Sequence, residues 1–213
     1  MARKRILETP SNVSASVSTR DQIAEVALAI LEAEGPAAVT MRRVAEAVGI
    51  TPMAIYHHFP NREALLDTIT NQEFAHLLSY IELRPNAKKS SGSAENQLIS
   101  NIEFYVNYAF DRPRIFDYVF AESRPNARRY PEDFRARLSP TFNPLVDLLA
   151  KLMKAGEIRK DDPYEVALAI WAHTHGYISL YRAGRFNLTE DQFRALVRRS
   201  LRRFIHGLKG LKA

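Results

Sequence analysis

The sequence contains no cysteine in its 213 residues. This absence excludes a disulfide framework, a thiolate metal site and a cysteine nucleophile, and it agrees with a reducing cytoplasm. No stretch approaches the roughly 20 apolar residues that a membrane-spanning helix needs. The basic residues 3–5 are not followed by an uninterrupted apolar segment, so no signal peptide is expected. We therefore expect a cytoplasmic protein that makes no membrane contact.

Strand patterns and enzyme motifs are also missing. No segment shows the strict apolar–polar alternation of a half-buried strand. There is no Gly-rich phosphate loop, no G-x-S-x-G, no H-E-x-x-H and no convincing pair of catalytic acids. We expect neither an enzyme nor a cofactor. With 46% apolar residues at helical spacing, the chain is predicted to be all-α, with about nine helices around a substantial core.

The first 65 residues carry no excess of positive charge, although a nucleic-acid partner would favour one. The formal net charge of +6 favours a polyanionic partner. However, residues 1–65 carry seven Lys and Arg against seven Asp and Glu, so the whole excess lies after them. Any DNA contact in the N-terminal part must therefore depend on a few well-placed cations.

Two short helices are predicted within residues 40–62. Thr40 can cap the first, and Gly49 follows its last apolar position, where a left-handed turn favours a residue without Cβ. Thr51 and Pro52 start the second helix, which Pro60 ends. The apolar positions fall at helical spacing at Met41, Val44, Ala45, Val48, Ile55 and Phe59. This is the pattern of a helix–turn–helix, whose second helix enters the DNA major groove. An ordinary helical hairpin is the alternative.

Residues 39–66 resemble the DNA-binding domain of TetR-family transcriptional regulators, above all in the run A-I-Y-H-H-F-P-N-R-E-A-L-L. The close resemblance covers roughly residues 19–68. It implies a homodimeric DNA-binding regulator that senses a small ligand among its middle helices. It also implies a base contact at Arg42 and phosphate contacts at Tyr56, His58 and Arg62.

The outward-facing residues of the motif predict two kinds of DNA contact. Arg42 can pair bidentately with guanine. Short or apolar side chains that open the second helix can meet thymine methyls, namely Pro52, Met53 and Ala54. Phosphate contacts are expected from Thr40, Thr51, Tyr56, His58 and Arg62. His57 can point to the groove or to the first helix. Each of these residues could also be an ordinary solvated side chain.

Three regions follow from these patterns. Residues 1–18 are expected to form a disordered basic arm, which either touches DNA or remains a solvated tail. Residues 19–66 form the helix–turn–helix domain, and residues 67–213 a helical domain for ligand binding and dimerisation. The remaining helices are expected over 20–34, 61–81, 94–110, 115–122, 132–155, 162–182 and 189–208, with a polar loop at 84–93.

The C-terminal part is rich in aromatic residues, which fit a ligand pocket or a closed core equally well. The family resemblance favours a pocket for an apolar or aromatic effector, lined by Phe104, Tyr105, Tyr108, Phe116, Phe120, Trp171 and His175. Trp171, His175 and Gly176 resemble the Trp-x-x-x-His-Gly pattern of one TetR subgroup. His173 and His175 would point about 200° apart on a helix, so they cannot share a metal ion.

A second copy of the chain is expected to pair through the last two helices, because a dimer reads two half-sites. The candidate interface residues are Leu168, Gly176, Tyr177, Phe193, Val197, Leu201 and Phe204. The chain is thus interpreted as a repressor that a small molecule releases from double-stranded DNA. The alternative is a constitutive or architectural DNA-binding protein without an effector.

Overall fold

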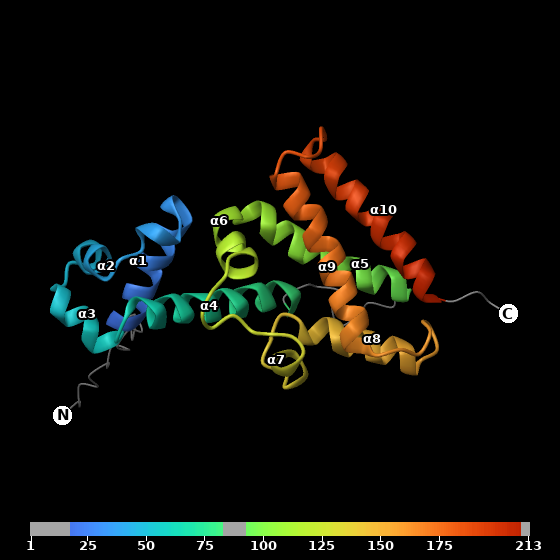
Figure 1. Ribbon diagram of the computed structural model, residues 1–213, viewed down its shortest axis with the longest axis horizontal. Helices are drawn as coiled ribbons and strands as arrows, with labels where there is room; N and C mark the ends of the chain where they lie inside the picture. Colours follow the sequence, from blue (N-terminus) through green and yellow to red (C-terminus); the bar gives the residue numbers. More distant parts are fainter. Residues whose placement is uncertain (1–17, 83–92, 210–213) are drawn as a thin grey trace, which may run out of the picture.

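The structure is a computed structural model that describes residues 18–82 and 93–209. Almost all of the expected basic arm (1–18) and of the polar loop (84–93) lies outside these residues. Within them the fold is all-α and contains no strand, which confirms the predicted class (Figure 1). The described helices number ten rather than about nine: α1 Thr19–Glu34, α2 Met41–Val48, α3 Pro52–His58, α4 Arg62–Glu82, α5 Ala94–Asp111, α6 Pro113–Phe116, α7 Glu132–Arg135, α8 Asn143–Lys154, α9 Pro163–Arg182 and α10 Glu190–Lys209.

The extra helix arises where prolines interrupt a predicted one. Residues 132–155 form α7 and α8, separated by turns around Pro140, because proline lacks the N–H of a helix interior and clashes with the preceding turn. Pro144 is accepted in the first turn of α8. The segment predicted over 115–122 divides into α6 and one π-helical turn, η2 (Asp117–Ala121).

The predicted helix ends around the turn are confirmed. Thr40 and Thr51 accept the backbone N–H of Arg43 and Ala54 at 3.3 and 3.1 Å, so each hydroxyl caps its helix. Gly49 adopts φ 81° and ψ 26°, the left-handed conformation for which glycine carries no steric cost. A single 3-10 turn, η1 (Pro36–Ala38), joins α1 to α2.

Helices α1–α3 and the start of α4 share one apolar centre. The side chains at the predicted stripe positions are completely buried there: Ile23, Ala27, Leu31, Val44, Ala45, Ile55, Phe59 and Leu65. Burying one large apolar side chain of this kind contributes about 1.5–3 kcal/mol. The turn between α2 and α3 is therefore held by a core common to all four helices.

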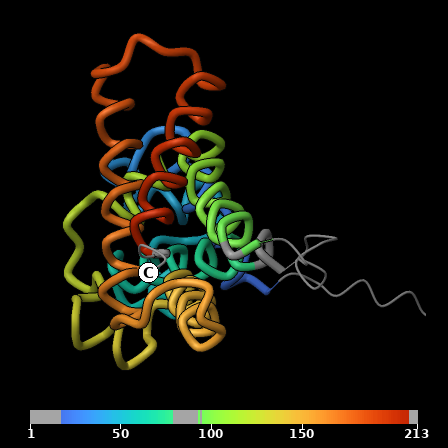
Figure 2. Tube along the Cα trace, turned by 90° about the vertical axis from the view of Figure 1, so that its right-hand side faces the viewer, coloured from blue at the N-terminus to red at the C-terminus, as the bar shows by residue number. Residues whose placement is uncertain are grey.

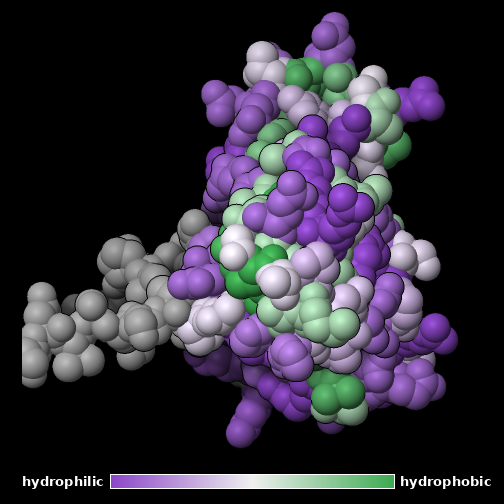
Figure 3. All heavy atoms as spheres, turned by 90° about the vertical axis from the view of Figure 1, so that its left-hand side faces the viewer, coloured by the Kyte–Doolittle hydropathy of each residue, from purple (hydrophilic) through white to green (hydrophobic). Residues whose placement is uncertain are grey.

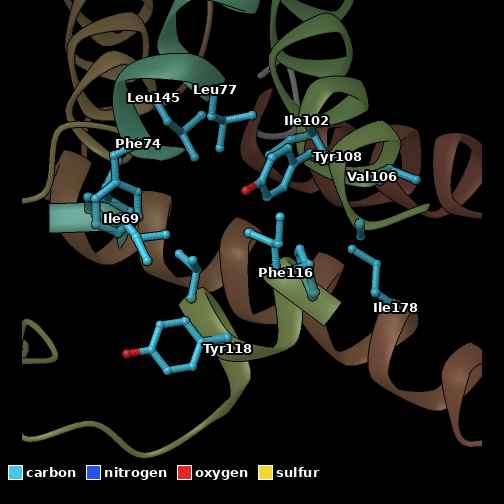
Figure 4. Close-up of a cluster of buried hydrophobic side chains, with 14 of the residues drawn as sticks. Ile69, Phe74, Leu77, Ile102, Val106, Tyr108, Phe116, Tyr118, Leu145 and Ile178 are labelled. Carbon is cyan, nitrogen blue, oxygen red and sulfur yellow. The ribbon is translucent and has the colours of Figure 1, made fainter. Parts of the chain in front are cut away.

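Helix α4 leaves this N-terminal unit and runs into the larger C-terminal bundle (Figure 1). There α5 packs against α4, α8, α9 and α10. Seen from the other end, α9 and α10 lie side by side along the outside of the bundle (Figure 2). Figure 4 shows buried side chains from α4, α5, α6, α8 and α9 meeting in one cluster. No helix of residues 18–82 and 93–209 is long and apolar enough to cross a membrane.

Three of the residues expected at a dimer interface lie elsewhere. Phe193, Val197 and Leu201 are buried inside the single chain, where α10 packs on α5 and α9. They have no free surface to offer a second copy. The amphipathic stripe of α10 was correctly located, but it covers the core of its own protomer. The other four candidates, Leu168, Gly176, Tyr177 and Phe204, remain partly exposed.

A buried ionic network joins the N-terminal unit to the bundle. Glu73 of α4 is 3% exposed. Its carboxylate accepts hydrogen bonds from the Arg112 guanidinium at 2.7 and 2.8 Å and from the Tyr108 hydroxyl at 2.7 Å. The same guanidinium donates to the Glu32 carboxylate on α1 at 3.0 and 3.2 Å. One arginine therefore connects α1, α4 and the end of α5.

Candidate DNA interface and effector cavity

The helix–turn–helix presents its predicted contact residues on the outside. Thr40, Arg42, Thr51, Pro52, Met53, Tyr56 and His57 are exposed, and Ala54 and His58 are partly exposed. Met53 is 72% exposed and Tyr56 50%, unusual values for large apolar or aromatic side chains. Figure 3, viewed from the end that carries α2 and α3, shows apolar residues within a largely hydrophilic surface. An exposed apolar spot with a polar rim is typical of a contact surface.

Arg42 and Arg43 are neighbours on α2 with different environments. Arg43 forms an ion pair with Glu34 of α1, and this hydrogen bond is the main reason that the pKa of Glu34 lies below its usual range. Within the described residues, the Arg42 side chain makes no hydrogen bond or ion pair. Its guanidinium is therefore available for an external acceptor, as expected for a residue that contacts bases or phosphates.

Arg62 has an internal role that the sequence did not indicate. Its Nε donates to the backbone carbonyl of Val39 at 2.7 Å, and a terminal nitrogen donates to the carbonyl of Pro36. The side chain thus fastens the η1 turn to the first residue of α4. These contacts use two of the five N–H donors of the guanidinium, so a phosphate contact by Arg62 stays a prediction.

Arg20 also makes internal contacts that the sequence did not predict. Its guanidinium lies 4.3 Å from the centre of the Phe59 ring and donates to the carbonyl of His58 at 2.6 Å. It thereby holds the C-terminal end of α3 against α1. No local pattern marks such a contact, since the partners are 38 residues apart.

A cavity lies in the bundle beside α4. Its free volume is about 150 Å³, and it opens to solvent. Four of the seven predicted ligand residues line it, namely Phe104, Tyr105, Phe120 and Trp171. Further apolar wall comes from Phe74, Leu77, Ile102, Val119, Phe134, Phe142 and Leu145, and polar groups come from Asn101, Glu122, Arg124, Arg128, Ser139 and Thr141.

Two more of the predicted ligand residues, His175 and Phe116, lie behind the side chains that line the cavity. His175 Nδ1 lies 2.8 Å from the Tyr105 hydroxyl, and the Phe116 ring stacks on the imidazole with centroids 5.6 Å apart. Burial raises the pKa of Tyr105, and a hydrogen bond with Trp171 opposes this shift. Burial lowers the pKa of His175, and the charge of Asp117 opposes that shift. Both side chains are therefore neutral at pH 7, and they fix the orientation of the aromatic wall.

Tyr108, the seventh predicted residue, does not line this cavity. Its hydroxyl donates to Glu73, and the residue borders a smaller hollow of about 110 Å³ near Arg112. Burial, and then the negative charge of Glu73, raise the pKa of Tyr108, so the hydroxyl keeps its proton. Tyr108 therefore belongs to the ionic network rather than to the cavity wall.

The two histidines of α9 point to opposite sides, as the helical spacing predicts. His173 Nε2 lies 3.0 Å from the Ser200 hydroxyl on α10, whereas His175 faces Tyr105 on α5. Among the described residues, no three His, Cys, Asp or Glu side chains gather in a way that could hold a metal ion.

An exposed helix–turn–helix on a separate helical bundle with its own cavity defines a DNA-binding regulator. Comparison with known families agrees. Residues 23–69 match the family described as bacterial regulatory proteins, tetR family. Residues 99–204 match the tetracyclin repressor-like C-terminal domain. The chain belongs to the TetR family of DNA-binding transcriptional regulators. Members of this family are regulators rather than enzymes.

Known proteins resemble the chain over most of its length. Nucleoid occlusion factor SlmA of Actinobacillus pleuropneumoniae is 23% identical over 181 residues, which is 84% of this chain and 81% of SlmA. A solved structure of a protein of unknown function from Rhodococcus sp. RHA1 has a TM-score of 0.73 at 21% identity, covering 91% of this chain and 98% of that one. FadR from Bacillus subtilis, solved with stearoyl-CoA, has a TM-score of 0.68 at 17% identity, covering 87% and 97%.

Proposed function

We propose that this regulator is a repressor that a small molecule, bound in the cavity of the bundle, releases from its operator. The observation that carries the proposal is the course of α4. Phe74 and Leu77 in its second half line the cavity, and Arg62 at its start fastens the turn before α2. A ligand that favours a different position of α4 therefore acts directly on the placement of α2 and α3.

The DNA side of the proposal rests on the exposed residues of α2 and α3. Arg42 is assigned to a guanine edge, and Pro52, Met53 and Ala54 to thymine methyls. Thr40, Thr51, Tyr56 and His58 are assigned to phosphates. Because few cations take part, one copy binds weakly, and a dimer that spans two half-sites about 34–36 Å apart provides the affinity.

Dimerisation is proposed to use the outer faces of α9 and α10. Leu168, Gly176, Tyr177 and Phe204 are partly exposed there, and Leu180 is 50% exposed. A Cβ placed on Gly176 would meet no atom within 4 Å apart from its chain neighbours and the adjacent backbone of α9, so this position is open to close approach by a partner. Regulators of this family bind DNA as dimers, which agrees with the assignment. The proposed place of action is the cytoplasm.

The effector side is supported by the cavity and by one relative. FadR, of the same fold, holds stearoyl-CoA. The alternative is a DNA-binding protein without an effector, and the similarity to nucleoid occlusion factors favours that reading. An aromatic cavity of about 150 Å³ among the helices of the bundle has no role under the alternative.

The test begins with selection of operator sequences from random DNA by the full-length protein. Fluorescence anisotropy then measures operator affinity with and without a metabolite panel. A compound that raises the melting temperature and weakens operator binding supports the proposal. If no compound changes either quantity, the effector-free alternative is favoured.

The docking itself is tested by Arg42→Ala, which should cost about 1–3 kcal/mol of discrimination between operator and mutated sites. Arg43→Ala is the matched control, since Glu34 already pairs with that guanidinium. Equal loss of base preference in both variants would show that Arg42 does not contact the bases.

A further inference from the structure

The cavity is apolar along most of its wall but ends at two arginines from the segment between η2 and α7. Arg124 donates to the Val119 carbonyl at 2.8 Å and to the Thr70 hydroxyl at 3.2 Å, and its Nε is buried with no hydrogen-bond partner among the described residues. Arg128 donates to the Asn71 side chain at 3.2 Å and lies 4.6 Å from the centre of the Phe74 ring. Each guanidinium has five N–H donors, and these contacts use only two of Arg124's and one of Arg128's.

Neither arginine at this end of the cavity forms an ion pair among the described residues. Within the described residues, neither Arg124 nor Arg128 is within 4.0 Å of a carboxylate oxygen. Burial, and then the positive charge of Arg124, lower the pKa of Arg128. Asp133 and Asp67 act in the opposite direction but less strongly.

The nearby acids Asp67 and Asp133 border the outer hollow beside the arginines, and they accept hydrogen bonds from other groups. Asp67 accepts a hydrogen bond from Asn126, and Asp133 accepts the backbone N–H of Arg129 at 2.7 Å. Glu122 lines the cavity, but its side chain is exposed. Two partly buried cations without a counter-ion are costly, and a bound anion removes that cost.

Arg124 and Arg128 also lie where the cavity opens to solvent. Arg124, Ala127 and Arg128 line both the inner cavity and an outer hollow of about 550 Å³ that is open to solvent. A ligand with an apolar body can therefore lie among Phe74, Phe120 and Trp171 while its polar end meets the guanidinium groups near the surface.

We propose that the effector is an amphipathic organic anion, with its apolar body in the aromatic cavity and its anionic group on Arg124 and Arg128. This proposal rests on the proposed function in assuming that the cavity is the effector site. Guanidinium groups suit both a carboxylate and a phosphate, because each accepts two parallel N–H hydrogen bonds. The family resemblance indicated only an apolar or aromatic effector; the two arginines add the charge.

The test uses two fluorescent probes that differ by one anionic group. They are 1-anilinonaphthalene-8-sulfonate and its neutral counterpart, N-phenyl-1-naphthylamine. Trp171 is the only tryptophan of the chain and lines the cavity, so energy transfer from it reports binding at this place. With full-length protein, the sulfonate should bind about tenfold or more tightly than the neutral probe, once each affinity is corrected for transfer of the probe from water.

Arg128→Gln should weaken the sulfonate about tenfold and leave the neutral probe within about twofold. Arg128 makes one hydrogen bond to a partly surface-facing side chain, so the fold should survive, and Arg128→Lys should recover part of the affinity. Arg185→Gln removes the same charge from the exposed end of α9 and is the control. Displacement by decanoate, decanamide and decanoyl-CoA separates a carboxylate group from a phosphate-bearing head.

The inference is overturned if the neutral probe binds as well as the sulfonate, if the sulfonate does not bind, or if Arg128→Gln and Arg185→Gln behave alike. Its failure differs from failure of the proposed function. If a neutral compound enters the cavity and releases operator DNA, the proposed repressor function is supported and the anionic nature of the effector is refuted. If an anion binds in a way that depends on Arg128 but leaves operator affinity unchanged, the anion site is supported and its role in release from DNA is refuted.

Discussion

Replacing Arg112 by alanine should be among the most damaging single changes outside the apolar core. Glu73, 3% exposed, would lose its ion pair with Arg112 and keep the Tyr108 hydroxyl, with His76 Nδ1 3.9 Å away. Breaking a buried ion pair by removing one member costs about 3–5 kcal/mol. The remaining partners place Arg112→Ala at the lower end, about 3 kcal/mol. For a chain of this size the melting temperature should fall by about 6–12 °C.

Neighbouring changes in the same network should cost less. Glu32 is about half exposed, with 47% of its side chain in solvent, so Glu32→Gln should cost less than about 1 kcal/mol. Combining Glu73→Gln with Arg112→Ala removes the stranded carboxylate and should recover at least about 1 kcal/mol relative to Arg112→Ala alone.

Urea unfolding followed by circular dichroism, at one fixed protein concentration, measures these differences. Arg159→Ala is the matched control, because its ion pair with Asp161 lies on the surface. The reasoning is refuted if Arg112→Ala costs no more than Arg159→Ala, or if adding Glu73→Gln to it destabilises the protein further.

Two other expectations concern the turn and a buried imidazole. Gly49→Ala should cost about 1 kcal/mol of unfolding free energy, because φ is 81° at that residue. Ala47→Gly in α2 should cost a similar amount through helix propensity alone. Denaturant unfolding measures both losses, and operator affinity distinguishes the two variants, since only Gly49→Ala strains the turn. His175 has a pKa below its ordinary value of 6.5 because it is buried. The folded state therefore binds fewer protons than the unfolded state, and stability present above pH 6.5 is lost as the pH falls below it. Stability curves between pH 7.5 and about 5.5 should be flatter for His175→Gln; an unchanged slope would mean that His175 protonates freely in the fold.

The local chemistry of the DNA-binding motif could be predicted from the sequence because its signals act over a few residues. A capping hydroxyl at Thr51, a proline at position 52 and a glycine at 49 determine where helices start and end through hydrogen bonds and φ angles within three or four residues. The apolar spacing then shows which face of each helix is buried. These rules do not depend on the rest of the chain, and the structure follows them.

Long-range partners could not be predicted in the same way. An apolar stripe on α10 shows that something covers it, but not whether the cover is α5 of the same chain or a second copy. Phe193, Val197 and Leu201 were therefore assigned to a partner and lie in their own core. Likewise the sequence at Arg62 fits a phosphate clamp, and only the positions of Val39 and Pro36 show that two of its N–H groups are engaged.

The sequence by itself determined the helical class, the helix–turn–helix and its exposed residues, because periodicity and capping are local properties of the chain. Only the tertiary structure decided how those helices are connected to the rest. It placed Arg112 between two carboxylates from different helices and left Arg124 and Arg128 at the end of an aromatic cavity without a counter-ion. Burial and charge balance arise from residues 39 to 80 positions apart, and no local pattern records which of them meet.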